Sequence, residues 1–152
     1  MITIIIINFR EGFMATLKYS KQRECIKRFL MNCTDHPTAD NIYESVRKEF
    51  PNISLGTVYR NLALLTSLGE IRKLSYDGGP DHYDADTSPH YHFNCKICGR
   101  VRDVSLEITD DLNLKAEEVL QVKVDEHRIN FYGVCQECLK TTDITAANKQ
   151  QN

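Results

Sequence analysis

Two cysteine pairs are the residues in this sequence whose spacing most clearly indicates chemistry. Cys95 and Cys98 form one C-x-x-C motif, and Cys135 and Cys138 form another. Each motif places two thiolates on a tight turn, and two such turns can close a tetrahedral shell of four sulfur ligands, which is typical of structural Zn²⁺. Separate redox-active pairs are the alternative, but an activated C-x-x-C thiol stands at a helix N-terminus, and neither pair is predicted to precede a helix.

A second group of potential ligands combines histidine with aspartate. His90 and His92 alternate on a predicted strand, so both imidazoles point to one face. Asp84 precedes them, Asp103 lies on the next predicted strand, and His36 lies in a predicted loop. Such a mixed nitrogen and oxygen set suits Fe²⁺ or Mn²⁺ and also accepts Zn²⁺. The alternative to a metal site is that these are ordinary surface and turn residues, with Asp103 an exposed carboxylate and His36 a cap or turn residue.

The elements that must position these residues begin with three short helices. Ser20, Thr38 and Ser54 are candidate N-caps, and Gly69 is a suitable residue to end the third helix. Residues 70–76 then alternate as a strand, a turn follows, and a return strand begins at 82–84. Three helices followed by a hairpin indicate a winged helix-turn-helix domain.

The third predicted helix carries side chains suited to DNA. Its cap region and solvent face offer hydroxyl, guanidinium and amide groups for phosphates and base edges, from Ser54, Thr57, Tyr59, Arg60 and Asn61. Residues 1–73 hold 11 Lys and Arg against 7 Asp and Glu, although the whole chain of 152 residues has a formal net charge of −2. This local positive charge favours DNA binding over the alternative of a solvated bundle surface.

The second half is predicted to form a smaller domain of mixed structure. Strands are expected at 90–94, 101–104, 122–125 and 128–133, with a helix at 109–120. The fold class is therefore α+β, a winged helix followed by a small α/β domain with an antiparallel sheet. The expected organisation is an extension at 1–13, a DNA-binding domain at 14–83, a hinge at 84–89, a metal-binding domain at 90–142 and a tail at 143–152.

The location expected from the sequence is the cytoplasm. No apolar run approaches the roughly 20 residues that a membrane span needs, and the first residues lack the features of an export signal. In the reducing cytosol, six cysteines are more often metal ligands than disulfides.

Four segments together resemble the ferric uptake regulator (Fur) family of bacterial metalloregulators. They are His36-Pro-Thr-Ala-Asp-Asn-Ile-Tyr43, the run from Ser54 to Leu62, His90-Tyr-His92-x-x-Cys95-x-x-Cys98-Gly99, and Tyr132-Gly-Val-Cys135-x-x-Cys138. The resemblance implies a homodimer that binds an inverted-repeat operator in double-stranded DNA, with the second domain serving dimerisation. It also implies structural zinc on the four cysteines and a metal-sensing site between the domains, formed by His36, Asp84, His90, His92 and Asp103.

Within this family the chain is most similar to the peroxide-sensing repressor (PerR) branch, because Asp103 stands where iron sensors tend to carry glutamate. This likeness implies a regulatory Fe²⁺ or Mn²⁺ and oxidation of His36 and His90 by peroxide. A repressor responding to iron, zinc or manganese without that oxidation is the alternative.

A small metal-dependent enzyme is the alternative from another class. The sequence holds no Ser-His-Asp arrangement and no glycine-rich phosphate loop, so neither catalysis nor a small-molecule substrate is expected, peroxide acting only as a signal. A further metal site of some iron sensors is not expected either, because Pro89 and Tyr91 replace two of its ligands and leave only His127.

Overall fold

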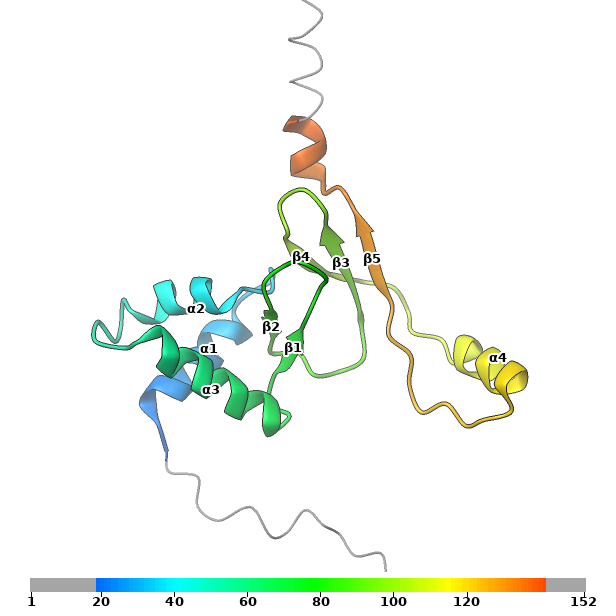
Figure 1. Ribbon diagram of the computed structural model, residues 1–152, viewed down its shortest axis with the longest axis horizontal. Helices are drawn as coiled ribbons and strands as arrows, with labels where there is room; N and C mark the ends of the chain where they lie inside the picture. The colour runs from blue at the N-terminus through cyan, green and yellow to red at the C-terminus, as the bar shows by residue number, and fades with distance from the viewer. Residues whose placement is uncertain (1–18, 142–152) are drawn as a thin grey trace, which may run out of the picture.

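The N-terminal half of the computed structural model is helical, and the structure describes residues 19–141. The extension expected at 1–13 and the tail expected at 143–152 lie outside these residues. The helices and the hairpin that follows them are α1 (Lys21–Met31), α2 (Ala39–Val46), α3 (Leu55–Ser67), β1 (Arg72–Leu74) and β2 (His82–Asp84). The two strands pair antiparallel, and Figure 1 shows the three helices grouped on one side of them.

All three predicted N-caps are confirmed. The side-chain oxygens of Ser20, Thr38 and Ser54 each accept a hydrogen bond from the backbone N–H three residues further on, at 3.4, 3.3 and 3.1 Å. Each bond satisfies one of the N–H groups that a helix leaves unpaired in its first turn. Gly69 follows the C-terminal end of α3 with a backbone φ of +69°. Residues that carry a Cβ atom rarely adopt this conformation, so glycine suits the position.

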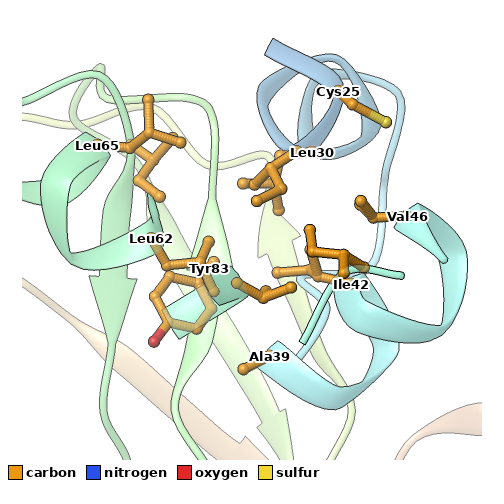
Figure 2. Close-up of a cluster of buried hydrophobic side chains, with 12 residues drawn as sticks. Cys25, Leu30, Ala39, Ile42, Val46, Leu62, Leu65 and Tyr83 are labelled. Carbon is orange, nitrogen blue, oxygen red and sulfur yellow. The ribbon is translucent and has the colours of Figure 1, made fainter. Parts of the chain in front are cut away.

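One hydrophobic cluster holds the helices and the hairpin together (Figure 2). Ile26 of α1, Ile42 of α2 and Leu62 of α3 are completely buried in it, and each contributes about 1.5–3 kcal/mol by leaving water. The hairpin joins the same cluster through Tyr83 of β2. The rigid helical unit therefore extends to the strand whose last residue is Asp84.

The second half is built on a three-stranded sheet. Its strands are β3 (Tyr91–Cys95), β4 (Val101–Val104) and β5 (Asn130–Gly133), in the order β4-β3-β5. β3 pairs antiparallel with β4 as expected, whereas β5 pairs parallel with β3. The sheet is mixed because the connection after β4 crosses to the other side of β3 and enters β5 from the end at which β3 begins.

The connection between β4 and β5 contains α4 (Asp111–Leu120), which confirms the helix predicted there. Figure 1 shows α4 on the far side of the sheet from the first three helices. The strand predicted at 122–125 is wrong: these residues have no ladder partner among the described residues, and Val122 is 53% exposed. Alternating apolar residues form a strand only where a neighbouring strand is within reach.

A helical segment at 136–141 follows directly on Cys135, where none was predicted. The N–H of Leu139 donates to the carbonyl of Cys135 at 2.9 Å, which is the first turn of this helix. Figure 1 shows the segment beyond the end of β5. The expectation that neither cysteine pair precedes a helix is therefore wrong for the second pair.

Residues 35–38 link the helical half to the sheet. The N–H of His36 donates to the carbonyl of Val101 at 3.3 Å, and Asp35 forms a β-bridge with Arg102, so this loop lies along the free edge of β4. On its other side, the carbonyl of Pro37 accepts from the N–H of Tyr83 at 3.0 Å. The loop is thereby fixed between β2 and β4.

Within the described residues, no helix has the length and apolar character needed to cross a membrane.

Candidate metal centres

The structure brings all five predicted histidine and aspartate ligands into one place, called here the His/Asp cluster. One ligand atom from each residue lies within 4.8 Å of all the others, and the residues are His36, Asp84, His90, His92 and Asp103. His92 and Asp103 face each other as register partners on β3 and β4. Asp84 comes from the end of β2, and His36 comes from the loop along the edge of β4. The cluster therefore joins the helical half to the sheet.

The three imidazoles converge on two carboxylates. Asp103 Oδ1 lies 2.7 Å from His36 Nε2 and 3.1 Å from His90 Nε2. Asp84 Oδ2 lies 3.1 Å from His90 Nε2 and 3.6 Å from His92 Nε2. Two negative carboxylates and three ring nitrogens around one point form a donor set for a divalent cation.

Three ligand atoms of the cluster are buried without a hydrogen-bond partner among the described residues. They are Asp84 Oδ2, His90 Nε2 and His92 Nε2. A buried polar atom left unsatisfied costs about 1–3 kcal/mol. Three such atoms facing one point in a folded protein fit a site built for an ion, because a cation would satisfy all of them together.

Neighbouring groups orient these ligands. His90 Nδ1 donates to the carbonyl of Ser88 at 2.9 Å, which leaves its Nε2 with a lone pair facing the cluster. Burial raises the pKa of the Asp84 carboxyl, but the His92 imidazole, the N–H of Asp86 and the other histidines outweigh it, and the pKa lies below its ordinary value. Asp84 is therefore held as the carboxylate that a metal ion requires.

The four C-x-x-C cysteines also meet, in what is called here the thiolate cluster. Their Sγ atoms all lie within 4.8 Å of one another. Cys95 Sγ is 3.9 Å from Cys138 Sγ, and Cys98 Sγ is 3.8 Å from Cys135 Sγ. Four sulfurs placed tetrahedrally at the Zn–S distance of about 2.3 Å are separated by about 3.8 Å. The cluster thus has the dimensions of a closed tetrathiolate zinc site.

The electrostatics of the thiolate cluster favour one ionised sulfur. Burial raises the pKa of the Cys95 thiol, but backbone N–H groups, including that of Cys135, outweigh it and bring the pKa to about 6. A hydrogen bond with Cys135 and burial raise the pKa of Cys138. The protein's own hydrogen-bond donors thus stabilise a single thiolate at Cys95, whereas ionising all four sulfurs requires a positive charge at the centre.

The predicted DNA-contacting residues lie at the N-terminal part of α3. Tyr59, 45% exposed, and Arg60 both reach solvent. The guanidinium of Arg60 donates to Thr57 Oγ1 at 2.9 Å, and Asn61 Nδ2 donates to the Thr57 carbonyl at 2.9 Å. Ser54 is the N-cap, so its hydroxyl serves the helix itself. These residues are brought together on one helix end, as the sequence indicated.

His127 is engaged outside both clusters. Its Nε2 lies 2.7 Å from the hydroxyl of Tyr91, and its Nδ1 lies 2.7 Å from Asn113 Oδ1. The ring thereby links α4 to β3.

Sequence reasoning missed two residues that surround His36. His82 is buried, and its Nδ1 donates to the carbonyl of His36 at 2.6 Å. Asp35 pairs with arginines of the β4 segment. Neither belongs to a motif, and the position of His82 on a short strand next to Asp84 was the only available signal.

The fold and the two clusters define a winged-helix protein with a tetrathiolate zinc-type site and a second metal-binding site between its halves. The chain belongs to the ferric uptake regulator family, whose sequence profile matches residues 14–132.

Relatives of the chain within this family include two named for peroxide. It is 40% identical to the peroxide operon regulator of Bacillus subtilis over 124 residues, which are 82% of this chain and 86% of the relative. It is 37% identical to the peroxide-responsive repressor PerR of Staphylococcus epidermidis over 124 residues, which are 82% of this chain and 83% of the relative.

Solved structures show the same fold. The ferric uptake regulator of Helicobacter pylori, described as having three functional metal-binding sites, matches with a TM-score of 0.72 at 27% identity, over 81% of this chain and 83% of that one. The peroxide stress regulator of Campylobacter jejuni matches with a TM-score of 0.66 at 29% identity, over 77% of this chain and 88% of that one.

Proposed function

We propose that this protein is a homodimeric, metal-dependent transcriptional repressor that senses hydrogen peroxide at the His/Asp cluster. One observation carries the proposal: five ligands from both halves of the molecule converge, and three of their buried atoms have no other partner among the described residues. The names of the relatives in Bacillus subtilis and Staphylococcus epidermidis support peroxide as the signal. The family assignment favours regulation over the alternative of a small metal-dependent enzyme.

The arrangement of the ligands explains how metal would control DNA binding. His36 belongs to the helical half, and His92 and Asp103 belong to the sheet. Held together, they fix α3 relative to the sheet, which we assign as the dimerisation domain. Two reading helices at a fixed separation match the half-sites of an inverted-repeat operator, and a dimer with loose helices does not. Metal thus selects the DNA-binding conformation.

We assign Fe²⁺ or Mn²⁺ to the His/Asp cluster and Zn²⁺ to the thiolate cluster. Bound Fe²⁺ would supply the electron that opens the O–O bond of peroxide and would regain one from the oxidised ring, so that the iron is unchanged overall. Overall, one peroxide oxygen is added to an imidazole carbon, and the other leaves as water. His36 and His90 are the proposed targets, and His90 lines a cavity of about 440 Å³ between the hairpin and β5, which gives peroxide a path. The modified ring is a poorer ligand, so metal and DNA are released.

The experiment that tests this function compares the two metals under a peroxide pulse. Protein loaded with Fe²⁺ is expected to gain the mass of one oxygen atom on the peptide carrying His36 or His90, and to leave the upstream region of its own gene in parallel. Protein loaded with Mn²⁺ should stay unmodified and bound, because Mn²⁺ supports this chemistry poorly. Peptide mass spectrometry and gel shift, run on the same samples, make the measurement.

The matched variant is Asp103→Glu. A longer carboxylate arm wraps the ion more fully, so this variant should keep metal-dependent DNA binding and respond less to peroxide. Wild-type protein that keeps its histidines intact and stays on DNA with Fe²⁺ and peroxide would be a metal sensor without peroxide chemistry.

For the DNA interface, we expect Arg60→Ala to weaken operator binding by on the order of tenfold to a hundredfold, since one contact is lost from each protomer. If Arg60 contacts phosphate, the slope of log affinity against log salt should also fall by about one for each lost contact. Fluorescence anisotropy at several salt concentrations measures both. Arg128→Ala, which removes an exposed arginine from the sheet half, is the control. If Arg60→Ala binds the operator with the affinity and salt dependence of wild type, this part of α3 is not the DNA interface.

A further inference from the structure

Four charged side chains form a network on the outer side of β4. Asp35 Oδ1 lies 3.0 Å from Arg102 Nε, and Asp35 Oδ2 lies 3.5 Å from Arg100 Nε. The same two arginines reach Glu137, whose Oε1 is 3.5 Å from Arg102 Nη2 and 3.7 Å from Arg100 Nη1. Each guanidinium therefore bridges two carboxylates that come from distant parts of the chain.

The two ends of the network adjoin the two metal centres. Asp35 directly precedes His36, the ligand that the helical half contributes to the His/Asp cluster. Glu137 lies between Cys135 and Cys138 in the thiolate cluster. Arg102 precedes Asp103, so the middle of the network is also next to a ligand. The network thus connects the segment that would carry zinc to the loop that would carry a regulatory ligand.

On the side facing β4, backbone contacts hold this loop at few points, whereas on the side facing β2 the N–H of Tyr83 and His82 Nδ1 donate to the carbonyls of Pro37 and His36 at 3.0 and 2.6 Å. His36 N–H donates to Val101 at 3.3 Å, and a single β-bridge joins Asp35 to Arg102. β4 is an edge strand, and the loop adds no ladder of several bonds to it. On the β4 side, the ion pairs between Asp35 and the arginines therefore add to the contacts that fix the position of His36, whose Nε2 meets Asp103 at 2.7 Å.

We propose that Arg100 and Arg102 are positioning residues, which hold His36 in the His/Asp cluster by tying Asp35 to Glu137, the residue before Cys138 of the thiolate cluster. The proposal rests on the proposed function in that the His/Asp cluster binds a regulatory metal. It adds that the zinc-carrying segment sets the affinity for that metal through these four charges. Arginine suits the role because its planar fork presents separate N–H groups to two carboxylates, whereas the ammonium of lysine is a single point charge.

The size of the effect follows from exposure. The four side chains are 38–51% exposed, so solvent weakens each ion pair. Two such pairs are lost when one arginine is neutralised, which corresponds to a change in affinity of about threefold to tenfold. The change should also shrink at high salt, because the screening length falls from about 10 Å at 0.1 M to about 3 Å at 1 M.

The test titrates Co²⁺ into full-length, zinc-loaded protein and follows its absorption bands, with Mn²⁺ as competitor. Arg102→Gln is expected to weaken Co²⁺ binding about threefold to tenfold while zinc stays at one per chain, and Arg102→Lys should recover part of the loss. Asp35→Asn and Glu137→Gln should act in the same direction. The matched control is Arg128→Gln, because Arg128 pairs with Glu126 at 2.6 Å, outside the network, and this variant should bind Co²⁺ like wild type.

A double variant shows whether the residues act as a unit. Asp35→Asn combined with Arg102→Gln should weaken Co²⁺ binding by less than the two single losses combined, because both substitutions remove the contact between Asp35 and Arg102. If Arg102→Gln loses zinc, Asp35→Asn, which lies away from the thiolate cluster, must still weaken Co²⁺ binding with zinc retained.

The outcomes separate the inference from the proposed function. Wild-type affinity in both Arg102→Gln and Asp35→Asn overturns the inference and leaves the proposed function intact. Additive losses in the double variant overturn it as well. A wild-type protein that binds no Co²⁺ at the His/Asp cluster overturns the proposed function and the inference together.

Discussion

Replacement of Cys98 by serine is expected to remove zinc from the protein and to unfold the sheet half or separate the dimer. Apparent binding free energies of structural zinc are about 10–16 kcal/mol, as large as the whole stability of a typical domain. The thiolate cluster joins the turn between β3 and β4 to the segment at 136–141. Without the ion, these segments are left with four sulfurs in a space sized for a metal. The loss should therefore be severe and not graded.

Cys98 is the informative position because it is exposed, whereas Cys95 is completely buried and its replacement would also disturb packing. Metal analysis, thermal unfolding and size-exclusion chromatography measure zinc content, stability and assembly. Cys33→Ser makes the same chemical change outside the thiolate cluster and should keep zinc. A Cys98→Ser protein that lacks zinc and remains a folded dimer would show that the four cysteines are not a structural site.

The helical half could be predicted from the sequence because its signals are local. A hydroxyl at each N-cap and apolar residues at helical spacing act within a few residues of one another, and the observed caps at Ser20, Thr38 and Ser54 are the predicted ones. Signals that depend on distant partners were less informative. The parallel pairing of β5 and the absence of a strand at 122–125 follow from how the chain crosses β3, which alternation along one segment does not encode.

The ligands of the metal centres also divide into those with a local sequence signal and those that depend on distant parts of the chain. Each C-x-x-C motif and the alternating His90 and His92 indicate a site by their own spacing. His36 and Asp84 carry no such local signal, and residue spacing together with the family resemblance suggested them. Their convergence depends on the loop at residues 35–38, fixed between β2 and β4. The charges that bind this loop to Glu137 come from three separate segments, and no motif predicted them.

Replacement of His92 by alanine is expected to abolish metal-dependent DNA binding while zinc and the dimer are kept. His92 is 4% exposed, and its Nε2 has no hydrogen-bond partner among the described residues. Loss of a residue that only orients a ligand costs about 10–100-fold in metal affinity, so loss of a ligand should cost on the order of a hundredfold or more. The remaining ligands then favour the DNA-binding conformation too weakly to populate it at Mn²⁺ concentrations that saturate wild type.

His127→Ala is the matched control for this prediction. It removes a histidine from the same half of the molecule, one that is hydrogen-bonded to Tyr91 and Asn113 and lies outside the His/Asp cluster. Operator binding of both variants is measured against Mn²⁺ concentration, with zinc content and assembly checked on the same samples. Only His92→Ala should lose the response to Mn²⁺. If His92→Ala binds the operator with the Mn²⁺ dependence of wild type, the His/Asp cluster does not control DNA binding, and the regulatory metal must act elsewhere in the chain.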